Sequence, residues 1–181
     1  PALSETLEAT TADLLSLAQD ADTVTSFDLN YRSKLWEPAE AKAVLTDLFP
    51  DVDVLVVARR DAELVLERHG DAEAVARGLA DDYGFDVTLV TRGAEGALAV
   101  ADGNVYEQPT YEASNAYPVG TGDSFVGGFL SQYLAGESVP DALEWGAATA
   151  ALKRSVPGDI AVVSPDEVRE VIAGDTSAIS R

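Results

Sequence analysis

The stretch from residue 115 to residue 134, NAYPVGTGDSFVGGFLSQYL, constrains this chain more than any other. Pro118 stops any preceding helix, because the residue before a proline is pushed toward extended geometry. After the turn Gly120-Thr121-Gly122, apolar residues recur at helical spacing, which predicts a helix buried on one side. The first N–H groups of a helix have no intrahelical partner, and the positive end of its dipole lies there. We therefore predict that the amides of residues 120–123 bind a phosphate or a developing oxyanion.

Asp123 is an unexpected residue in such a turn, because a carboxylate repels a bound anion. Its presence makes sense if Asp123 accepts a proton from a hydroxyl group that attacks the phosphate. The alternative is that Asp123 and Ser124 only start a helix after a glycine turn. Two glycines, Gly127 and Gly128, each cost about 1 kcal/mol relative to alanine inside a helix. That cost predicts another backbone packed closely against them.

The charge balance excludes one class of partner. The chain has 32 Asp and Glu against 12 Lys and Arg, a net charge of −20, which argues against nucleic-acid binding. With 46% hydrophobic residues and few lysines, the acidic chain resembles a folded protein of a salt-loving organism; an acidic mesophilic protein is the alternative. We find no membrane-spanning run and no leader, and the lack of cysteine suggests a cytoplasmic protein without disulfides or thiolate metal sites.

The length of 181 residues favours one domain, and the absence of methionine suggests a piece of a longer protein. Helices and strands alternate, which predicts an α/β fold with a mostly parallel sheet. The expected helices are residues 3–20, one from 38, 61–69, 71–83, the central helix, 140–154 and one from 165, with strands at 23–27, 52–57 and 87–91. A hairpin turning at 102–104 and a short apolar stretch at 160–163 complete the pattern.

Four loops should meet at the carboxyl ends of these strands, where ligands of such sheets bind. They are residues 28–36, 58–63, 91–96 and 118–123. His69 should meet the carbonyl groups at the end of the helix 61–69. With one histidine and no cysteine, a transition-metal site is not expected.

The stretch Gly120-Thr-Gly-Asp-Ser-Phe-Val-Gly-Gly128 resembles the signature of the ribokinase family of sugar kinases, Gly-Ala-Gly-Asp followed by a glycine-rich helix. Thr121 replaces the alanine. The resemblance covers nearly the whole chain and implies a ribokinase-like three-layer α/β/α fold. Residues 1–181 would form the C-terminal part of one kinase domain, without its N-terminal strands and lid. The resemblance also implies ATP and Mg²⁺ as cofactors and Asp123 as the catalytic base that meets the acceptor sugar. Gly120, Thr121 and Gly122 would stabilise the transferring phosphoryl group.

The segment Asp28-Leu-Asn-Tyr-Arg-Ser-Lys-Leu-Trp36 is similar to the Asp-x-Asn-x-Arg-x-x-Leu-Trp signature of 2-keto-3-deoxygluconate kinases in that family. The similarity implies that Arg32 meets the carboxylate of a sugar acid and that Asn30 lies near the ATP phosphates. The alternative is a surface ion pair of Asp28 with Arg32, with Trp36 in the core. Asp159, after Pro157-Gly158, resembles an acid that contacts the sugar hydroxyl groups.

Two further segments resemble family motifs. Thr91-Arg-Gly-Ala-Glu-Gly96 looks like the family's Thr-x-Gly-x-x-Gly, which implies that Thr91, Gly93 and Gly96, with Gly122, contact the nucleotide. Glu63 stands where the Asn-x-x-Glu motif has a glutamate that organises water around magnesium, although Arg60 replaces the usual asparagine. The alternative for residues 91–96 is an ordinary turn between two strands. The alternative for Glu63 is an ordinary acidic residue in the first turn of a helix. The small residues 147–151 predict close helix packing or one wall of an adenine pocket.

The resemblance implies ATP-dependent phosphorylation of a primary hydroxyl group of 2-keto-3-deoxygluconate to give its 6-phosphate. A kinase of a neutral sugar such as ribose or fructose is one alternative. A nucleotide-binding module without kinase activity is another, and the missing lid would be the place for a homo-oligomer contact. A dehydrogenase-type domain is rejected, because it requires Gly-x-Gly-x-x-Gly after the first strand and here Gly-x-Gly comes late, at residues 120–122.

Overall fold

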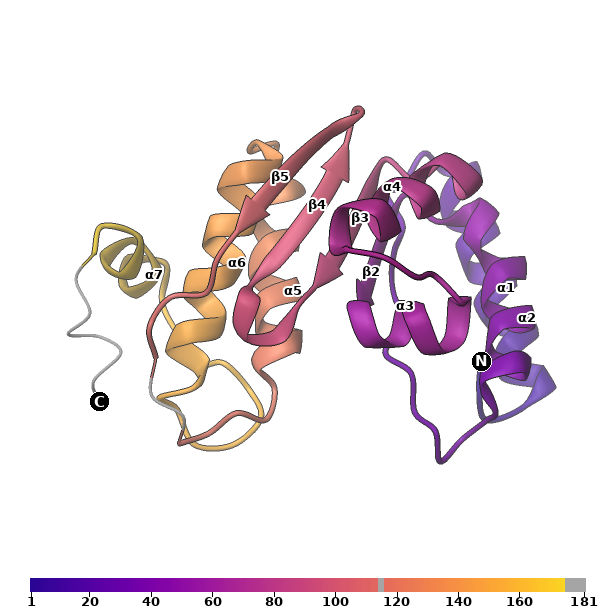
Figure 1. Cartoon of the computed structure of the whole chain (residues 1–181), viewed down its shortest axis with the longest axis horizontal. Coiled ribbons are helices and arrows are strands. Elements are labelled where there is room, and N and C mark those ends of the chain that lie inside the picture. The colour runs from indigo at the N-terminus through magenta and orange to yellow at the C-terminus, as the bar shows by residue number, and fades with distance from the viewer. Residues whose placement is uncertain (114–115, 175–181) are drawn as a thin grey trace. The chain divides into compact units, whose positions relative to one another are not determined.

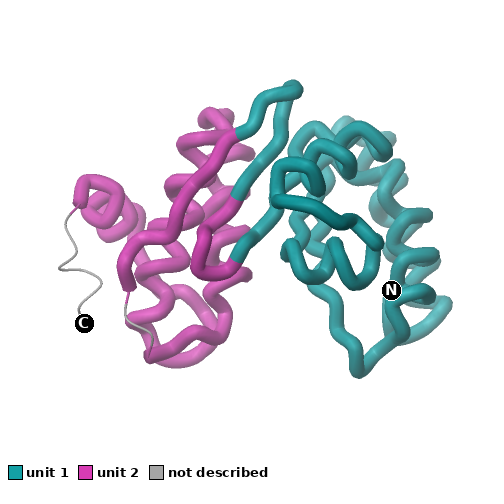
Figure 2. Tube along the Cα trace, viewed as in Figure 1, with its two compact units in different colours: residues 1–92, 98–105 teal, residues 93–97, 106–181 magenta. Residues whose placement is uncertain are grey.

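The computed structural model describes residues 1–113 and 116–174; Asn115, in the stretch singled out above, lies outside them. The chain divides into two compact units, residues 1–92 with 98–105 (unit 1) and 93–97 with 106–181 (unit 2) (Figure 2). The elements of Figure 1 are, in order, α1 (Glu5–Asp20), β1 (Ser26–Asp28), α2 (Pro38–Leu48), the 3₁₀ turn η1 (Phe49–Asp51), β2 (Val54–Ala58), α3 (Arg59–Leu66), α4 (Ala72–Tyr83), β3 (Val87–Thr91), the 3₁₀ turn η2 (Gly93–Glu95), β4 (Ala97–Ala101), β5 (Asn104–Gln108), α5 (Thr121–Tyr133), α6 (Val139–Lys153) and α7 (Pro165–Ile172). No helix in the described ranges has the length and apolar composition needed to cross a membrane.

The five strands form one sheet in the order β1-β2-β3-β4-β5. The first three strands run parallel, with Ser26 opposite Val54 and Val54 opposite Val87. β4 and β5 form a hairpin around Asp102 and Gly103, whose φ angles of 49° and 73° are those of a tight two-residue turn. The prediction of an α/β fold with a largely parallel sheet is confirmed, and the parallel part is the one built by alternating strands and helices.

The core of unit 1 forms around β2 and β3, which are buried on both faces as near-continuous apolar strands should be. Phe49 is fully buried and meets the rings of Tyr83 and Phe85 edge-on, with centroid distances of 4.9 and 5.3 Å. The carboxyl ends of the strands therefore project from a rigid core. By contrast, α1 has no buried residue, so the leucines of the predicted amphipathic helix leave one face exposed.

The helix predicted at 61–69 was wrong at both ends. It begins at Arg59, directly after β2, so residues 58–63 are the end of a strand and the start of α3 rather than a loop. It ends at Leu66, because Glu67 takes a left-handed φ of 55° and its N–H donates to the carbonyl of Ala62. The strand predicted at 23–27 is also shifted and covers only Ser26–Asp28.

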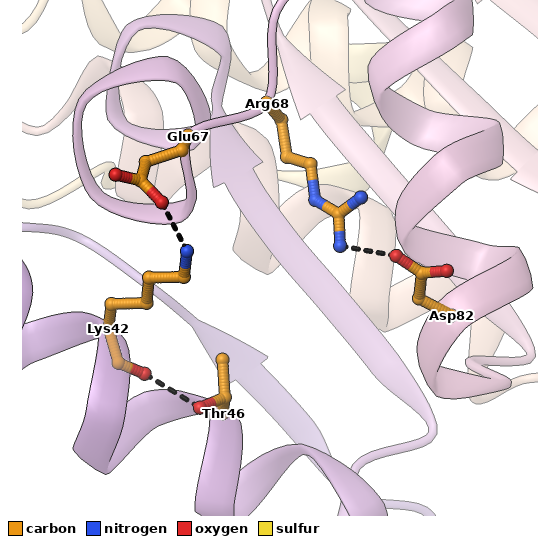
Figure 3. A network of polar contacts seen from close by, with 5 residues as sticks. All are labelled: Lys42, Thr46, Glu67, Arg68 and Asp82. Atoms are coloured by element: carbon orange, nitrogen blue, oxygen red, sulfur yellow. Dashed lines mark hydrogen bonds and ion pairs between the residues drawn. The ribbon is translucent and has the colours of Figure 1, made fainter.

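Polar contacts fix the turn that ends α3 (Figure 3). Glu67 pairs with Lys42 of α2, and this hydrogen bond holds the pKa of the Glu67 carboxyl below its usual range. Arg68 pairs with Asp82 of α4. These two ion pairs bind the turn to both neighbouring helices, so α3 keeps its orientation at the carboxyl end of β2.

In unit 2, α5 and α6 pack together through small residues. A Cβ atom added to Gly128 would lie 3.0 Å from the Cα atom of Gly146 and 2.7 Å from the Thr149 hydroxyl. The predicted close backbone contact is confirmed for Gly128, whereas a Cβ atom on Gly127 would meet open space. The alanines of residues 147–151 are buried, as the prediction of close packing requires.

The short apolar stretch at 160–163 forms no strand, and the side chains of Ile160 and Val162 are 71% and 75% exposed. The last helix begins at Pro165 as predicted. It packs on α6 through Val168 and Val171.

Candidate active site

The turn before α5 depends on Gly120. Its φ angle of 80° lies in the left-handed region, and a Cβ atom there would lie 2.0 Å from the carbonyl oxygen of Asp159. Only glycine tolerates both the conformation and the approach. The turn is therefore built against the backbone of the loop that carries Asp159, and the structure brings these two predicted site segments together.

Hydrogen bonds close this turn but leave two amides open. The N–H and hydroxyl groups of Thr121 donate to the carbonyl of Pro118, at 3.3 and 2.7 Å. The N–H and hydroxyl groups of Ser124 donate to the carbonyl of Gly120, at 2.9 and 2.7 Å. Within the described part of the chain, the N–H groups of Gly122 and Asp123 donate to no protein acceptor. Two open amides at the positive end of a 13-residue helix favour an anion.

The carboxylate of Asp123 lies at the same place. It is exposed and makes no hydrogen bond or ion pair with any described residue. Asp123 and Asp159 both line a hollow of about 730 Å³. Its other walls come from α5, α6, the loop after α6 and α7, with lining residues Ser124, Gly127, Gly128, Ser131, Gln132, Trp145, Thr149, Ile160, Ala161, Val163, Ser164, Pro165 and Val168. An unpartnered carboxylate beside open amides can accept a proton from a group held there.

Unit 1 places its predicted residues at the carboxyl edge of the parallel strands. Asn30 follows β1 with a φ angle of 39°, which asparagine tolerates better than most residues. Arg32 is exposed, and its guanidinium donates to the carbonyls of Asn30 and Tyr31 at 3.4 and 3.2 Å. Both bonds go to main-chain carbonyls of the same loop, and the alternative of a surface ion pair with Asp28 stays open.

The residues around Arg32 belong to the core. Trp36 packs against the core of unit 1, as the alternative for this segment expects, and its carbonyl accepts a 2.8 Å hydrogen bond from the hydroxyl of Tyr31. Burial raises the pKa of the Tyr31 phenol, and the charges of Glu37 and Asp61 raise it further. The side chain of Arg32 is thus exposed, while its neighbour Tyr31 and the nearby Trp36 are held in the core of unit 1.

Glu63 lies on the exposed side of α3. Its Oε1 atom is 3.7 Å from Nδ1 of His69, so the histidine meets this carboxylate beyond the end of α3, and its predicted place at a helix end was wrong. Asp61, which no sequence pattern marks, is 5% exposed, and its carboxylate accepts a hydrogen bond from Nε of Arg60 at 3.2 Å. Among the described residues, no group of three or more His, Asp or Glu side chains is placed to hold a metal ion.

The predicted nucleotide segment has two conformationally special glycines. Thr91 ends β3 in unit 1, and Gly93 and Gly96 follow in unit 2 with φ angles of 62° and 91°. A Cβ atom on Gly96 would lie 2.0 Å from the carbonyl oxygen of Gln108, so the backbone at the end of β5 requires this glycine. The backbone alone explains Gly96, and its contact with a nucleotide stays a prediction.

The sequence also gives no sign that Lys153 is buried. It ends α6 with a side chain that is 0% exposed. The charge pattern of the sequence cannot predict this burial. A lysine at the end of a helix is ordinarily exposed to solvent, where it still interacts favourably with the helix dipole. Only the packing of the loops around it reveals its position.

The chain is similar to known carbohydrate kinases. Residues 2–166 match the pfkB family carbohydrate kinases. The 2-dehydro-3-deoxygalactonokinase of Haloferax volcanii is 57% identical over all 181 residues, which cover 57% of its length. The 2-dehydro-3-deoxygluconokinase of Thermoproteus tenax is 33% identical over 150 residues, 81% of this chain and 46% of that protein.

Solved structures share the fold. The 2-dehydro-3-deoxygluconokinase of Thermotoga maritima superposes with a TM-score of 0.88 at 29% identity, over 96% of this chain and 57% of that one. A nucleoside kinase of Methanocaldococcus jannaschii, an archaeal member of the ribokinase family, gives 0.70 at 23% identity, over 88% and 52%, which shows the fold alone. The ribokinase-like fold predicted from the sequence is confirmed, and the chain spans about half the length of these relatives. The chain belongs to the pfkB family of carbohydrate kinases.

Proposed function

We propose that this chain supplies the phosphoryl-transfer part of an ATP-dependent kinase whose acceptor is a 2-keto-3-deoxy sugar acid. The observation that carries the proposal is the start of α5, where the N–H groups of Gly122 and Asp123 are open beside an unpartnered carboxylate. A site that only bound phosphate would have no use for that negative charge. A site that transfers phosphate to a hydroxyl group needs a proton acceptor there.

In the proposed reaction, the acceptor hydroxyl gives its proton to the carboxylate of Asp123, and its oxygen attacks the terminal phosphorus of ATP. The open amides stabilise the charge on the transferring group, and ADP leaves. Because the transition state of such transfers is loose, positioning contributes more than the strength of the base. Asp159, whose backbone supports Gly120, is proposed to contact the sugar hydroxyl groups.

Magnesium is proposed to arrive with the nucleotide. Mg²⁺ keeps several waters and is commonly held by one or two carboxylates together with substrate phosphates, so it needs no cluster of three protein ligands. The chain's candidate is Glu63, which is exposed on α3 and able to hold a water of the ion. When bound, the ion would neutralise phosphate charge. Asn30, Thr91, Gly93 and Gly96 remain the proposed nucleotide contacts.

The acceptor is proposed from Arg32 and from the names of the relatives. The Haloferax volcanii relative is named for 2-keto-3-deoxygalactonate, and the Thermoproteus tenax and Thermotoga maritima proteins for 2-keto-3-deoxygluconate. Because Arg32 is exposed, its burial does not by itself require a bound anion. Its planar fork suits a carboxylate, which both sugar acids carry and neutral sugars lack. 2-Keto-3-deoxygluconate and its galactonate counterpart are therefore the acceptors to test first.

The test compares wild type with Arg32→Lys in an ADP-release assay. Because the chain spans 57% of the Haloferax volcanii relative, the assay uses a chimera that joins to it the part of that relative left uncovered. Charge-assisted hydrogen bonds contribute roughly 1.5–3 kcal/mol, so kcat/KM for the sugar acids should fall about 10-fold to 150-fold. Ribose and fructose should be poor acceptors that the substitution barely affects.

Three results would contradict the proposal or part of it. A wild-type preference for ribose or fructose would leave a sugar kinase whose acceptor is neutral. ATP binding without ADP release for any of these acceptors would instead favour a nucleotide-binding module. An equal loss on both kinds of acceptor would remove Arg32 from the site.

We also propose that the protein works at high salt in the cytoplasm and that the chain is the C-terminal part of a longer kinase domain. The net charge of −20 supports the first point, because screening relieves the repulsion among acidic side chains. The melting temperature should rise from millimolar to molar KCl. A flat or falling melting temperature over that range would contradict the adaptation to salt.

A further inference from the structure

Lys153 is the most deeply buried cationic side chain in the described part of the chain, with 0% exposure. Its Nζ atom donates to the main-chain carbonyls of Tyr117, at 3.2 Å, and Val156, at 3.1 Å. Lysine is almost never fully buried unless it is paired, because an unpaired buried ammonium is costly. Here both of these partners are carbonyls rather than carboxylates. The position therefore requires another source of stabilisation.

The end of α6 supplies it. Lys153 is the last residue of this 15-residue helix, where the negative end of the dipole lies and the final carbonyls lack helical partners. The chain folds back there, since the N–H of Val156 donates to the carbonyl of Lys153 at 3.0 Å. An ammonium group has three N–H donors and no acceptor, which suits a pocket of converging carbonyls.

The two carbonyls that the ammonium joins belong to the segments that build the phosphate turn. Tyr117 lies three residues before Gly120, and Val156 lies three residues before Asp159. The N–H of Tyr117 adds a 3.2 Å bond to the carbonyl of Arg154. The same segments meet again at their far ends, where Gly120 abuts the carbonyl of Asp159. Residues 117–120 and 156–159 are thus held together at both ends, once by the ammonium and once by direct contact.

We infer that Lys153 is a positioning residue whose charge holds the phosphate turn in shape. It contacts no reacting group; it fixes the carbonyl of Tyr117, and through residues 118–120 it sets where the open amides of Gly122 and Asp123 lie. The effect of Lys153 on the shape of the turn is inferred from its hydrogen bonds to Tyr117 and Val156. Its effect on turnover rests on the proposed function.

The first experiment measures amide hydrogen exchange in this chain, which needs no kinase activity. Lys153→Met keeps the length and apolar volume of the side chain but removes the ammonium. Exchange of residues 117–123 should rise about 10-fold or more, while residues in the middle of α5 and α6 exchange as in wild type. Lys42→Met is the matched control, because it removes an ammonium that pairs with Glu67 in unit 1. No rise, or an equal rise throughout unit 2, would overturn the inference.

The second experiment restores the charge by chemistry. The chain has no cysteine, so Lys153→Cys provides a single thiol. In the unfolded state, its thiolate displaces bromide from 2-bromoethylamine to give an S-aminoethyl side chain, which closely matches lysine. With 1-bromopropane it gives an S-propyl side chain of equal length without charge. After refolding, the aminoethyl protein should regain wild-type exchange at residues 117–123 and the propyl protein should not. Equal behaviour of the two would show that the charge has no role.

The kinetic consequence is measured on the chimera. Lys153→Met should lower kcat about 10-fold or more and leave the KM for ATP within a few-fold, because the shape of the turn matters most in the transition state. A fall confined to protein stability, with kcat unchanged in the folded fraction, would contradict the positioning role. If the wild-type chimera shows no kinase activity, the proposed function fails, while the exchange experiments still decide the role of Lys153.

Discussion

Helices α5 and α6 carry an aspartate at the same position, the third residue of the helix, and use it differently. In α6, Asp141 accepts from the hydroxyl of the capping residue Ser138, whose oxygen in turn accepts from the Asp141 N–H at 3.3 Å. In α5 the capping residue is Gly120, which has no side chain to offer, and both the carboxylate and the N–H of Asp123 stay open. One helix start is satisfied by its own residues, and the other is left for a ligand.

The difference comes from a single position, the capping residue. Serine at residue 138 lets α6 begin in an ordinary extended conformation, with φ and ψ of −66° and 154°. Glycine at residue 120 permits a left-handed conformation and the close approach of Asp159. An open helix start costs stability, because unpaired donors lose the cap that is worth about 1 kcal/mol. Such a cost is typical of functional sites.

The largest effect on stability is expected from Gly120→Ala. The new methyl group would enter the left-handed region and collide with the carbonyl oxygen of Asp159, so the turn must move. The free energy of unfolding should fall by at least about 2 kcal/mol, and turnover of the chimera should fall with it. Urea unfolding and the ADP-release assay measure the two losses. A variant with wild-type stability would show that the turn does not depend on this contact.

A smaller effect is expected from Ser138→Ala at the satisfied helix start. Loss of the cap should lower the free energy of unfolding by about 1 kcal/mol. Turnover of the folded protein should not change, because Ser138 lies outside the hollow lined by Asp123. A clear loss of turnover in the folded protein would break the contrast between the two helices.

The smallest effect on stability is expected from Gly122→Ala. Beyond its chain neighbours and the backbone of its own helix, no described atom lies within 4 Å of the added methyl group, and the backbone is helical. Stability should therefore be unchanged or rise by up to about 1 kcal/mol. Turnover should nevertheless fall, because the methyl group crowds the open amides. Gly78→Ala in α4 is the matched control, since its methyl group would meet only the end of Arg68 at 3.9 Å. If both variants keep full turnover, the amides of α5 bind no phosphate.

The sequence predicts the regular parts of this structure well. β3 has the predicted bounds, and α5 and α6 begin within a residue or two of theirs, because apolar periodicity and the residues at helix starts act locally. The end of α3 could not be predicted, since Glu67 adopts a left-handed conformation that depends on contacts with Lys42. The signature around Asp123 marked the turn, but no local pattern shows that Gly120 abuts Asp159, or that Lys153 is buried between the two loops.

The central claim is that Asp123 acts as the base and Asp141 only caps a helix. Turnover of the chimera carrying Asp123→Asn or Asp141→Asn, with ATP and 2-keto-3-deoxygluconate or its galactonate counterpart, tests it most directly. Asp123→Asn should keep the affinity for ATP and lose about 100-fold or more in kcat, the usual scale for removal of a general base. Asp141→Asn should keep kcat near wild type. Near wild-type turnover in Asp123→Asn, or an equal loss in both variants, would contradict the account.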